Sequence, residues 1–371
     1  MPESKHARNR PRWMPWAALG GALLIGGLAG GFIGAAINSS SASTTTTPPS
    51  SSGSSSGLSV CNVTSVANQV IPSVVTISVQ SGAQGGTGSG EVIRSDGYIL
   101  TNNHVIAAAA NGGSVDVLFS DGTTAPAQIT GRDPQTDLAV IKVQPPHNLK
   151  VIQLGSSASA VVGQPVVVVG APLGLSGTVT SGIISALNRT IQVPGEDNST
   201  ALLVDAIQSD AAINPGNSGG AMVNCNDQLI GIPSAGAVVP SSSGESSGGS
   251  IGLGFAIPVD LAKTISDEII ATGSVTHSYF GLVTVPIPRE AAAQAGVPEG
   301  LYIRTAVPGG PAAQAGLREG DVITTIDGKP ATSNTQLQEI TLTKKRGDTV
   351  DIGYDRNGKS ATTKITLGTQ P

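Results

Sequence analysis

The chain has 371 residues, a formal net charge of −5, 39% hydrophobic residues and only 3% aromatic residues. This length and hydrophobic content predict two folded domains with cores built mainly from Val, Ile, Leu and Ala. No basic stripe occurs beyond the N-terminus, which argues against a nucleic-acid partner. The 49 glycines and 24 prolines favour short strands joined by turns over long helices.

The N-terminal segment has the pattern of a membrane anchor. A basic stretch, residues 1–16, precedes residues 17–37, AALGGALLIGGLAGGFIGAAI, which carry no charge. That run is long enough to cross about 30 Å of hydrocarbon. Basic flanks stay in the cytoplasm, so we expect a single-pass protein of the cell membrane whose remaining residues are extracytoplasmic. A cleaved signal peptide is the alternative, and it would also export the remainder.

Residues 38–60 read NSSSASTTTTPPSSSGSSSGLSV, without charge and almost without bulky side chains. Such a composition cannot bury enough apolar surface to fold, which predicts a disordered linker.

Residues 61–271 are predicted to form a mostly β domain. Short β-rich runs alternate with Gly, Pro, Asn and Asp, as in a sandwich or barrel: Val74–Val79, Val115–Phe119, Leu138–Val143, Val166–Val169 and Leu229–Ile232. Apolar residues at helical spacing in Asp260–Ala271 predict one helix that closes this domain. A low-complexity insertion, Pro240–Ser250, is expected to be a loop.

Residues 277–371 are predicted to form a second domain. Strands are expected near Leu301–Arg304, Val322–Ile326 and Val350–Tyr354. The stretches AAAQAGVPEG (291–300) and PAAQAGLREG (311–320) echo each other. Two copies are too few for a solenoid, so we interpret them as two turn-like elements of one domain.

The run NPGNSGGA, residues 214–221, is the strongest chemical signal. A serine hydroxyl needs a neighbouring base to become a nucleophile, and acyl transfer creates a negative oxygen that N–H donors must meet. Glycines around Ser218 let the backbone turn successive N–H groups toward one point. Ser218 is therefore a candidate nucleophile, although an ordinary Gly-Asn-Ser turn would have the same sequence.

His104, in TNNHV after a strand-like run, is the candidate base among four histidines. Asp137, just before an apolar strand, could accept the Nδ1 proton of that histidine and fix its tautomer. Other aspartates compete for this role: Asp116, Asp121, Asp133 and Asp210. The chain order His–Asp–Ser is that of chymotrypsin-like proteases, and the choice of Asp137 among these aspartates rests on the family resemblance given next.

Six motifs in order resemble the HtrA/DegP family of PDZ-containing serine proteases. They are GTGSGEVI (86–93), GYILTNNHV (97–105), DPQTDLAVIKV (133–143), TSGIISALNR (180–189), IQSDAAINPGNSGGAMVN (207–224) and IGLGFAIP (251–258). The resemblance covers about residues 65–371. It implies a chymotrypsin-like double six-stranded β-barrel protease domain followed by a PDZ domain.

The resemblance also implies residue roles. His104, Asp137 and Ser218 would be the catalytic triad, and Gly216, Asn217 and Ser218 would form the oxyanion hole through backbone N–H groups. Arg189 matches an arginine on a loop that switches the active site between states. Residues near the S1 pocket would be Ile213, Ile251 and Leu253, which suits small or medium aliphatic side chains at the cleavage point.

In the second domain, Phe280, Gly281 and Leu282 match the loop that holds a peptide C-terminal carboxylate in the family, and a neighbouring strand could pair with the peptide. These residues could equally serve only to build the fold. The resemblance further implies unfolded or extended polypeptides as substrates and a homotrimer. The sequence contains no metal-ligand set. The glycine-rich GGTGSG (85–90) lacks the Lys-Ser/Thr ending of a phosphate loop, so no cofactor motif is predicted there either.

Cys61 and Cys225 depart from many family members. In an oxidising exported setting they could form a disulfide that pins the start of the domain, or they could remain free or pair between molecules.

The expected function is an ATP-independent serine endopeptidase of the cell envelope that cleaves misfolded or regulatory proteins. A chaperone or peptide-binding scaffold on the same fold is the alternative, and an adhesin on a Ser/Thr-rich stalk is a third hypothesis.

Overall fold

The computed structural model describes most of the chain after the Ser/Thr-rich segment. The described residues are 61–82, 84–171, 177–196, 199–236 and 250–370. The expected anchor (17–37) and linker (38–60) lie outside these residues, as does nearly all of the insertion at 240–250. Among the described helices, none is both long enough and apolar enough to cross a bilayer.

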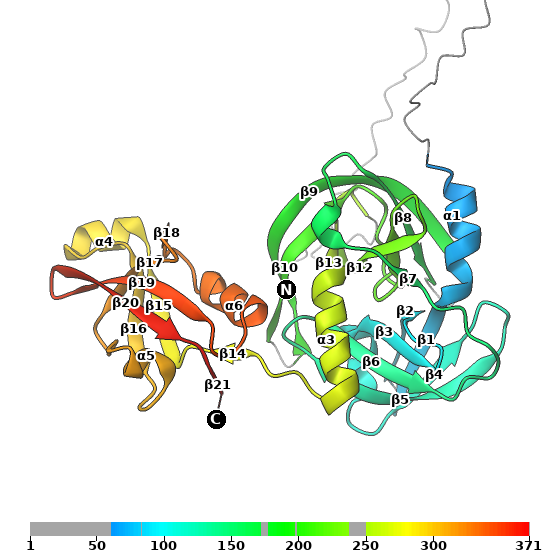
Figure 1. Ribbon diagram of the computed structural model, residues 1–371, viewed down its shortest axis with the longest axis horizontal. Coiled ribbons are helices and arrows are strands. Elements are labelled where there is room, and N and C mark those ends of the chain that lie inside the picture. Colours follow the sequence, from blue (N-terminus) through cyan, green and yellow to red (C-terminus); the bar gives the residue numbers. More distant parts are fainter. Residues whose placement is uncertain (1–60, 83, 172–176, 197–198, 237–249, 371) are drawn as a thin grey trace, which may run out of the picture. The chain divides into compact units, whose positions relative to one another are not determined.

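The first barrel closes on itself in the strand order β1-β2-β3-β6-β5-β4 (Figure 1). Its strands are β1 (Val74–Ser81), β2 (Gln84–Val92), β3 (Tyr98–Asn102), β4 (Ser114–Leu118), β5 (Thr124–Asp133) and β6 (Leu138–Val143). The interior is filled by β-branched side chains such as Ile77, Ile99 and Ile141, all fully buried. Three runs predicted as strands from their β-rich composition fall within or largely overlap β1, β4 and β6.

The second barrel is also a closed ring of six strands. They are β8 (Pro165–Gly170), β9 (Thr178–Pro194), β10 (Thr200–Ser209), β11 (Ala221–Val223), β12 (Gln228–Gly236) and β13 (Gly254–Pro258). The order is β11-β8-β9-β10-β13-β12, and a pairing of β11 with β12 completes the ring. A short strand, β7 (Gln153–Leu154), adds to β12 in parallel. The expectation of a double six-stranded barrel is confirmed.

The two barrels share a buried seam of apolar side chains. Leu100, Leu138 and Val140 of the first barrel pack in one cluster with Val167 and Val169 of the second. Side chains on the strands that face this seam therefore have little access to water, and a polar group there needs a hydrogen-bond partner. This seam positions the candidate site described below.

The helix α1 (Val63–Val70) lies in the mostly β domain and was not predicted from the sequence. Its N-cap is Asn62, whose side chain accepts a hydrogen bond from Ser65 N. Val66, Ala67 and Val70 are buried at helical spacing and form one apolar face of the helix. The remaining helical elements of this domain before residue 258 are short: η1 (Ile71–Ser73), α2 (Asn103–Ile106), η2 (Ala107–Ala109) and η3 (Ser157–Ser159).

The helix predicted over Asp260–Ala271 is α3 (Val259–Thr272). It buries one face, including Ala262, Ile265 and Ile269, and it ends where Gly273 adopts a left-handed conformation. In Figure 1 this helix lies against the barrels, and it packs on strands β5, β6 and β12.

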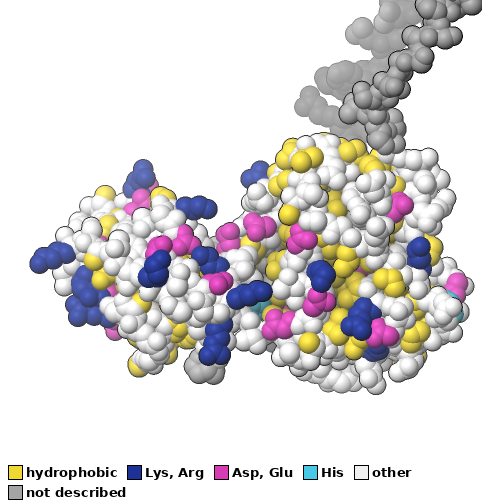
Figure 2. Space-filling view, in the orientation of Figure 1, with side chains coloured by type: hydrophobic (Ala, Val, Ile, Leu, Met, Phe, Trp, Pro, Cys, Tyr) yellow, Lys and Arg dark blue, Asp and Glu magenta, His cyan; other side chains and the backbone are white. Residues whose placement is uncertain are grey.

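The C-terminal domain has a sheet in the order β15-β16-β17-β19-β20. Its elements are β14 (Ser278–Tyr279), β15 (Leu282–Ile287), α4 (Arg289–Ala295), β16 (Gly300–Ala306), α5 (Pro311–Gln314), β17 (Val322–Ile326), β18 (Lys329–Pro330), α6 (Asn334–Thr343), β19 (Thr349–Arg356), β20 (Lys359–Thr366) and β21 (Gly368–Thr369). The three predicted strands fall in β16, β17 and β19. On the face shown in Figure 2, acidic and basic side chains are interspersed over this domain.

The two echoing stretches are short helices rather than simple turns. α4 ends at Gly296 (φ 65°), and the last turn of α5 is followed by Gly316 (φ 84°). Each AQAG sequence therefore ends a helix with a left-handed glycine.

Candidate active site

His104 and Asp137 form a tight pair at one end of the first barrel. His104 lies in α2, directly after β3, and Asp137 lies in the turn just before β6. The ring Nδ1 of His104 is 2.8 Å from Asp137 Oδ2 and 3.0 Å from Oδ1, and the backbone N–H of His104 donates to Oδ1 over 3.0 Å. The Asp137 side chain is 5% exposed and that of His104 is 43% exposed. The imidazole thus presents its other nitrogen toward solvent while its Nδ1 is fixed.

The backbone of Asp137 is held as firmly as its side chain. Its carbonyl accepts from the Asn103 N–H (3.1 Å) and from Asn102 Nδ2 (2.8 Å), and its φ is +58°, uncommon for a residue with a Cβ. Strands β3 and β6 are neighbours with Asn102 opposite Leu138. This pairing brings the two ends together, so the acid–base pair follows from the register of one strand pair.

Ser234 completes this network, and the sequence analysis did not identify it. Its hydroxyl donates to Asp137 Oδ2 over 2.6 Å, and its own side chain comes from β12 of the second barrel. The sequence around it, GIPSAG, carries no signal that separates this serine from the many others in the chain. Only the docking of the two barrels reveals the contact.

Ser218 lies in the loop between β10 and β11, at the rim of the same cleft as His104. The cleft has a volume of about 330 Å³ and is lined by Gly86, Thr87, His104, Val105, Ile213, Asn214, Pro215, Gly216, Ser218, Ser234 and Ser250. The hydroxyl of Ser218 donates to the carbonyl of Ser234 over 3.3 Å. In this conformation the Ser218 hydroxyl is therefore hydrogen-bonded to a backbone oxygen rather than to His104.

The competing aspartates have other partners. Asp133 accepts from Thr136 Oγ1 (2.5 Å) and lies 2.9 Å from His277 Nε2. Asp121 caps the turn at Thr123, and Asp210 accepts from the Ile183 N–H. Asp116 lies on an exposed position of β4. Asp137 is the aspartate that the structure places against His104.

The three residues predicted for the oxyanion hole, Gly216, Asn217 and Ser218, differ in how their backbone N–H groups are used. The N–H of Asn217 donates to the Asn214 carbonyl over 3.0 Å, and the Asn217 side chain donates to the Ala212 carbonyl. The Asn217 N–H is therefore engaged within the turn. Within the described residues no partner is recorded for the N–H groups of Gly216 and Ser218. Gly216 has φ +100°, a conformation that favours glycine.

Of the three residues predicted near the S1 pocket, one lines the cleft and two do not. Ile213 is 4% exposed and lines the cleft, and its side chain lies against Gly254, where an added Cβ would approach within 2.6 Å. Ile251 and Leu253 are 49% and 38% exposed and are not among the cleft-lining residues.

Arg189 was expected on a loop, but the structure places it within β9, opposite Ala206 of β10. The register shifts there, and Asn188 and Asp205 both have positive φ (54° and 52°). The position is thus a bulge in a long hairpin, which re-aims side chains without ending the strand. The Arg189 side chain is exposed.

In the C-terminal domain, Phe280 is buried and its carbonyl accepts from the Ala312 N–H, while the Gly281 carbonyl accepts from the Val307 N–H. Leu282 begins β15, which occupies the edge of the sheet and has β16 as its one neighbour in that sheet. Asn334, at the start of α6, bonds to both the hydroxyl and the carbonyl of Thr284. The loop therefore leads into an edge strand with a helix beside it.

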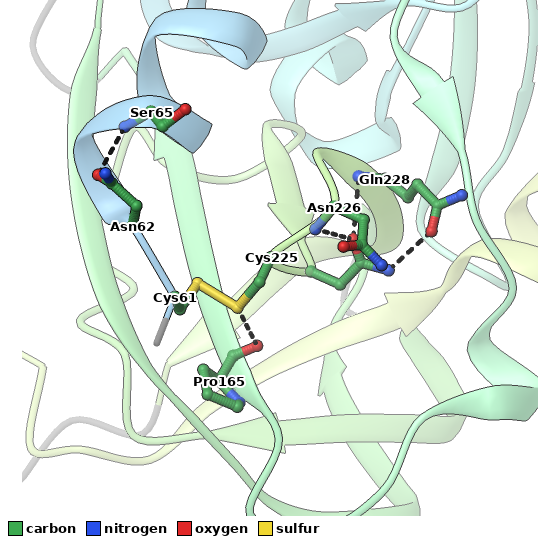
Figure 3. The surroundings of a disulfide bond; sticks show 8 residues. Cys61, Asn62, Ser65, Pro165, Cys225, Asn226 and Gln228 are labelled. Atoms are coloured by element: carbon green, nitrogen blue, oxygen red, sulfur yellow. Dashed lines mark hydrogen bonds between the residues drawn. A yellow bond between two sulfur atoms is a disulfide. The ribbon is translucent and has the colours of Figure 1, made fainter. Parts of the chain in front are cut away.

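Cys61 and Cys225 are paired in the structure, with their Cα atoms 5.2 Å apart (Figure 3). The bond joins the residue before the N-cap of α1 to the turn between β11 and β12. The turn itself is organised by Asn224, whose side chain accepts from the N–H groups of Asn226 and Gln228. The disulfide therefore attaches the start of the described domain to the second barrel.

Comparisons with known proteins agree with this architecture. A model of the trypsin-like peptidase domain matches residues 88–232, and a PDZ domain model matches residues 275–367. The two-barrel fold with histidine, aspartate and serine at its seam is that of the trypsin-like serine peptidases, here followed by a PDZ domain.

The chain is 43% identical over 326 residues to serine protease PepD of Mycobacterium tuberculosis, covering 83% of this chain and 66% of that protein. It is 38% identical over 288 residues to the periplasmic pH-dependent serine endoprotease DegQ of Escherichia coli, covering 76% and 60%. A solved structure of the HtrA-type protease AlgW with a decapeptide has 33% identity and a TM-score of 0.66, covering 83% of this chain and 99% of that one. This chain belongs to the HtrA/DegP-like family of serine proteases. It spans between 53% and 66% of the length of these and similar curated relatives.

Proposed function

We propose that the chain is an ATP-independent serine endopeptidase of the cell envelope, which cleaves misfolded or regulatory proteins with PDZ-assisted substrate recognition or activation. The observation that supports this most strongly is the His104–Asp137 pair in the wall of a cleft that also holds Ser218. A buried carboxylate that fixes one imidazole nitrogen leaves the other free to act as a base.

In the proposed reaction, the Ser218 hydroxyl leaves the Ser234 carbonyl and donates to Nε2 of His104. His104 takes the proton as Ser218 Oγ attacks the scissile carbonyl, and it later delivers the proton to the leaving amine. Asp137, itself held by Ser234, keeps the Nδ1–H in place and stabilises the imidazolium. The N–H groups of Gly216 and Ser218 donate to the oxygen of the tetrahedral intermediate. Water repeats the sequence to release the acyl group.

Substrate selection is proposed to combine two sites. Ile213 gives the cleft an apolar wall, which suits a small or medium aliphatic side chain at the cleavage point. Phe280, Gly281 and Leu282 would hold a peptide C-terminus, with the peptide added to the edge of β15. The AlgW structures contain a decapeptide or a tripeptide, which supports peptide binding in this family. Arg189 is proposed to take part in switching the site between inactive and competent states.

The cellular context is proposed from the sequence and the family. The uncharged run 17–37 would anchor the chain in the membrane with its N-terminus in the cytoplasm. Relatives named periplasmic endoproteases support an extracytoplasmic protease and PDZ domain. A homotrimer is proposed on the family resemblance.

The activity is tested with the full chain in detergent and unfolded casein as substrate. Cleavage is expected for the wild type and for Ser114→Ala, a matched substitution at an exposed position of β4, but not for Ser218→Ala. Casein cleavage that survives in Ser218→Ala would refute the assignment.

A chaperone or peptide-binding scaffold is the second candidate. The observation in its favour is the Ser218 hydroxyl directed at Ser234 O, which is not the geometry of an attacking nucleophile. A scaffold predicts that the wild type suppresses casein aggregation without cleaving it, and that an organophosphate reagent does not label Ser218.

A further inference from the structure

Ser89, on β2 of the first barrel, is fully buried and faces the loop of the second barrel that carries Ser218. Its hydroxyl donates to the Gly216 carbonyl over 2.6 Å and accepts from the Ala171 N–H over 2.8 Å. Its backbone N–H donates to the Ser218 carbonyl over 2.9 Å. One residue of the first barrel thus bonds to both residues whose N–H groups are proposed to form the oxyanion hole.

The polarity of these bonds is fixed. A serine hydroxyl has one proton, and the Gly216 carbonyl can only accept, so that proton goes to Gly216 and a lone pair receives the Ala171 N–H. The Ser89 carbonyl is in turn held by Thr101 Oγ1 of β3 over 2.6 Å. Ser89 therefore cannot rotate its hydroxyl elsewhere without leaving the buried Gly216 carbonyl unpaired, which is unfavourable.

The loop packs closely against Ser89 at its two glycines after Ser218. A Cβ added at Gly219 would lie 2.4 Å from the Ser89 carbonyl oxygen, and one at Gly220 would lie 3.2 Å from Ser89 Cβ. The loop therefore contacts β2 after Ser218 through these glycines and before it through the Gly216 carbonyl.

Gly216 needs external contacts to select its conformation, since glycine adopts positive and negative φ about equally well. Its N–H and its carbonyl belong to successive peptide planes, which are related by the two backbone torsions of Gly216, and its φ is +100°. Holding the carbonyl fixes the plane that follows Gly216 and so limits the orientations left to the plane that carries its N–H. Donors aimed before the reaction stabilise the oxyanion without reorganisation.

We propose that Ser89 is a positioning residue for the oxyanion hole: its hydroxyl and N–H hold the Gly216 and Ser218 carbonyls so that the N–H groups of these two residues converge. Ser89 touches no substrate. Its loss would weaken stabilisation of the tetrahedral intermediate more than binding of the ground state, because the intermediate depends on both donors. This inference rests on the proposed peptidase activity.

The test compares full-length Ser89→Ala with Ser73→Ala, both in detergent. Ser73 is a matched control, since it is 1% exposed and its hydroxyl donates to the Val70 carbonyl over 2.7 Å, away from the cleft. Two quantities are measured: kcat and KM for a peptide substrate, and the affinity of a peptide boronic acid with valine at its reactive end, which forms a tetrahedral adduct with a serine hydroxyl.

For Ser89→Ala we expect kcat to fall about tenfold to a hundredfold, less than or comparable to the loss of one oxyanion donor, with KM changed less than about twofold. Boronate affinity should fall by a similar factor, since the adduct also places an oxygen in the hole. Ser73→Ala should leave all three quantities near the wild-type values. Ser89→Cys, which keeps the shape but donates weakly, should lie between wild type and Ser89→Ala, and it decides the matter if Ser89→Ala does not fold.

Unchanged kcat and boronate affinity in an otherwise active enzyme would overturn the role of Ser89 alone. Equal losses in Ser73→Ala would do the same, because they would trace the effect to stability. A wild type that neither cleaves peptide nor binds the boronate would overturn the proposed function, and the inference about Ser89 with it.

Discussion

The two barrels contribute to the site in different ways. In the first barrel, His104 and Asp137 are brought together by the pairing of neighbouring strands β3 and β6, and the bonds from Asn102 and Asn103 come from the same barrel. In the second barrel, Ser218 lies on a loop whose carbonyls are held by Ser89 of the first barrel. The contact between His104 and Asp137 is thus made within one barrel, with Ser234 of the second barrel added behind Asp137, whereas the loop of Ser218 depends on how the barrels dock.

This difference indicates where the activity can be controlled. A pair fixed by strand register changes only if the barrel itself opens. A loop held by contacts across a seam can lose its active geometry while both barrels stay folded, because few bonds determine it. The Ser218 hydroxyl agrees with this difference between the barrels. It belongs to the second barrel, and it donates to the Ser234 carbonyl rather than to His104.

The largest effect is expected from breaking the preformed pair. Asp137→Asn should lower kcat by about 10⁴-fold with the fold intact, because an amide stabilises the wrong tautomer of His104. Kinetics with a peptide substrate and far-UV circular dichroism together check this. Asp116→Asn, on an exposed position of β4, is the matched control and should retain wild-type kcat. A loss of less than about tenfold in Asp137→Asn would mean that the first barrel does not supply the acid–base pair in this way.

A smaller effect is expected from releasing the second barrel from the start of the domain. The Cys61–Cys225 bond closes a loop with a sequence separation of 164. Replacing both cysteines by serine should lower the free energy of unfolding by about 2–4 kcal/mol. Urea unfolding followed by circular dichroism measures it, and wild type treated with a reductant should match the double variant. Coincident curves for oxidised wild type and the double variant would show that the bond contributes nothing to stability.

The smallest effect concerns a group at the seam itself. Glu91 is fully buried opposite Val74 and Leu100, and within the described residues neither carboxylate oxygen has a hydrogen-bond partner. Burial raises the pKa of Glu91 well above its ordinary value. The folded state therefore keeps the proton longer than the unfolded state, so stability is highest below the unfolded pKa, about 4.3, and declines as the pH rises toward the folded pKa.

Glu91→Val should accordingly raise the free energy of unfolding at pH 7.5 by about 1–3 kcal/mol, the range for an unsatisfied buried polar group. Its stability should change less between pH 5 and pH 7.5 than that of the wild type. Glu91→Gln is the control that removes the ionisation but keeps the polar burial. Urea unfolding at both pH values separates these contributions. A wild-type stability that rises over this interval, with Glu91→Val flat, would contradict the assigned direction.

Sequence reasoning reached much of the fold and the site, and the errors have physical causes. The β-rich runs predicted strands correctly where side chains alternate or are wholly buried, as in Val74–Val79 and Leu138–Val143. Reasoning from the sequence missed α1, because Val66 and Val70 suit a strand as well as a helix and only burial on one face decides between them. Arg189 was expected on a loop, since a bulge inside a long hairpin leaves no turn signal in the sequence.

By itself, the sequence predicted the order of the two domains and the candidate residues for the chemistry, because motifs that resemble a known family are local stretches of the chain. The tertiary structure alone decided the partners of those residues: Asp137 rather than Asp133 beside His104, Ser234 behind Asp137, and Ser89 behind the nucleophile loop. Each of these contacts joins residues more than 30 positions apart. Such pairs depend on the register of strands and the docking of two barrels, which no local pattern encodes.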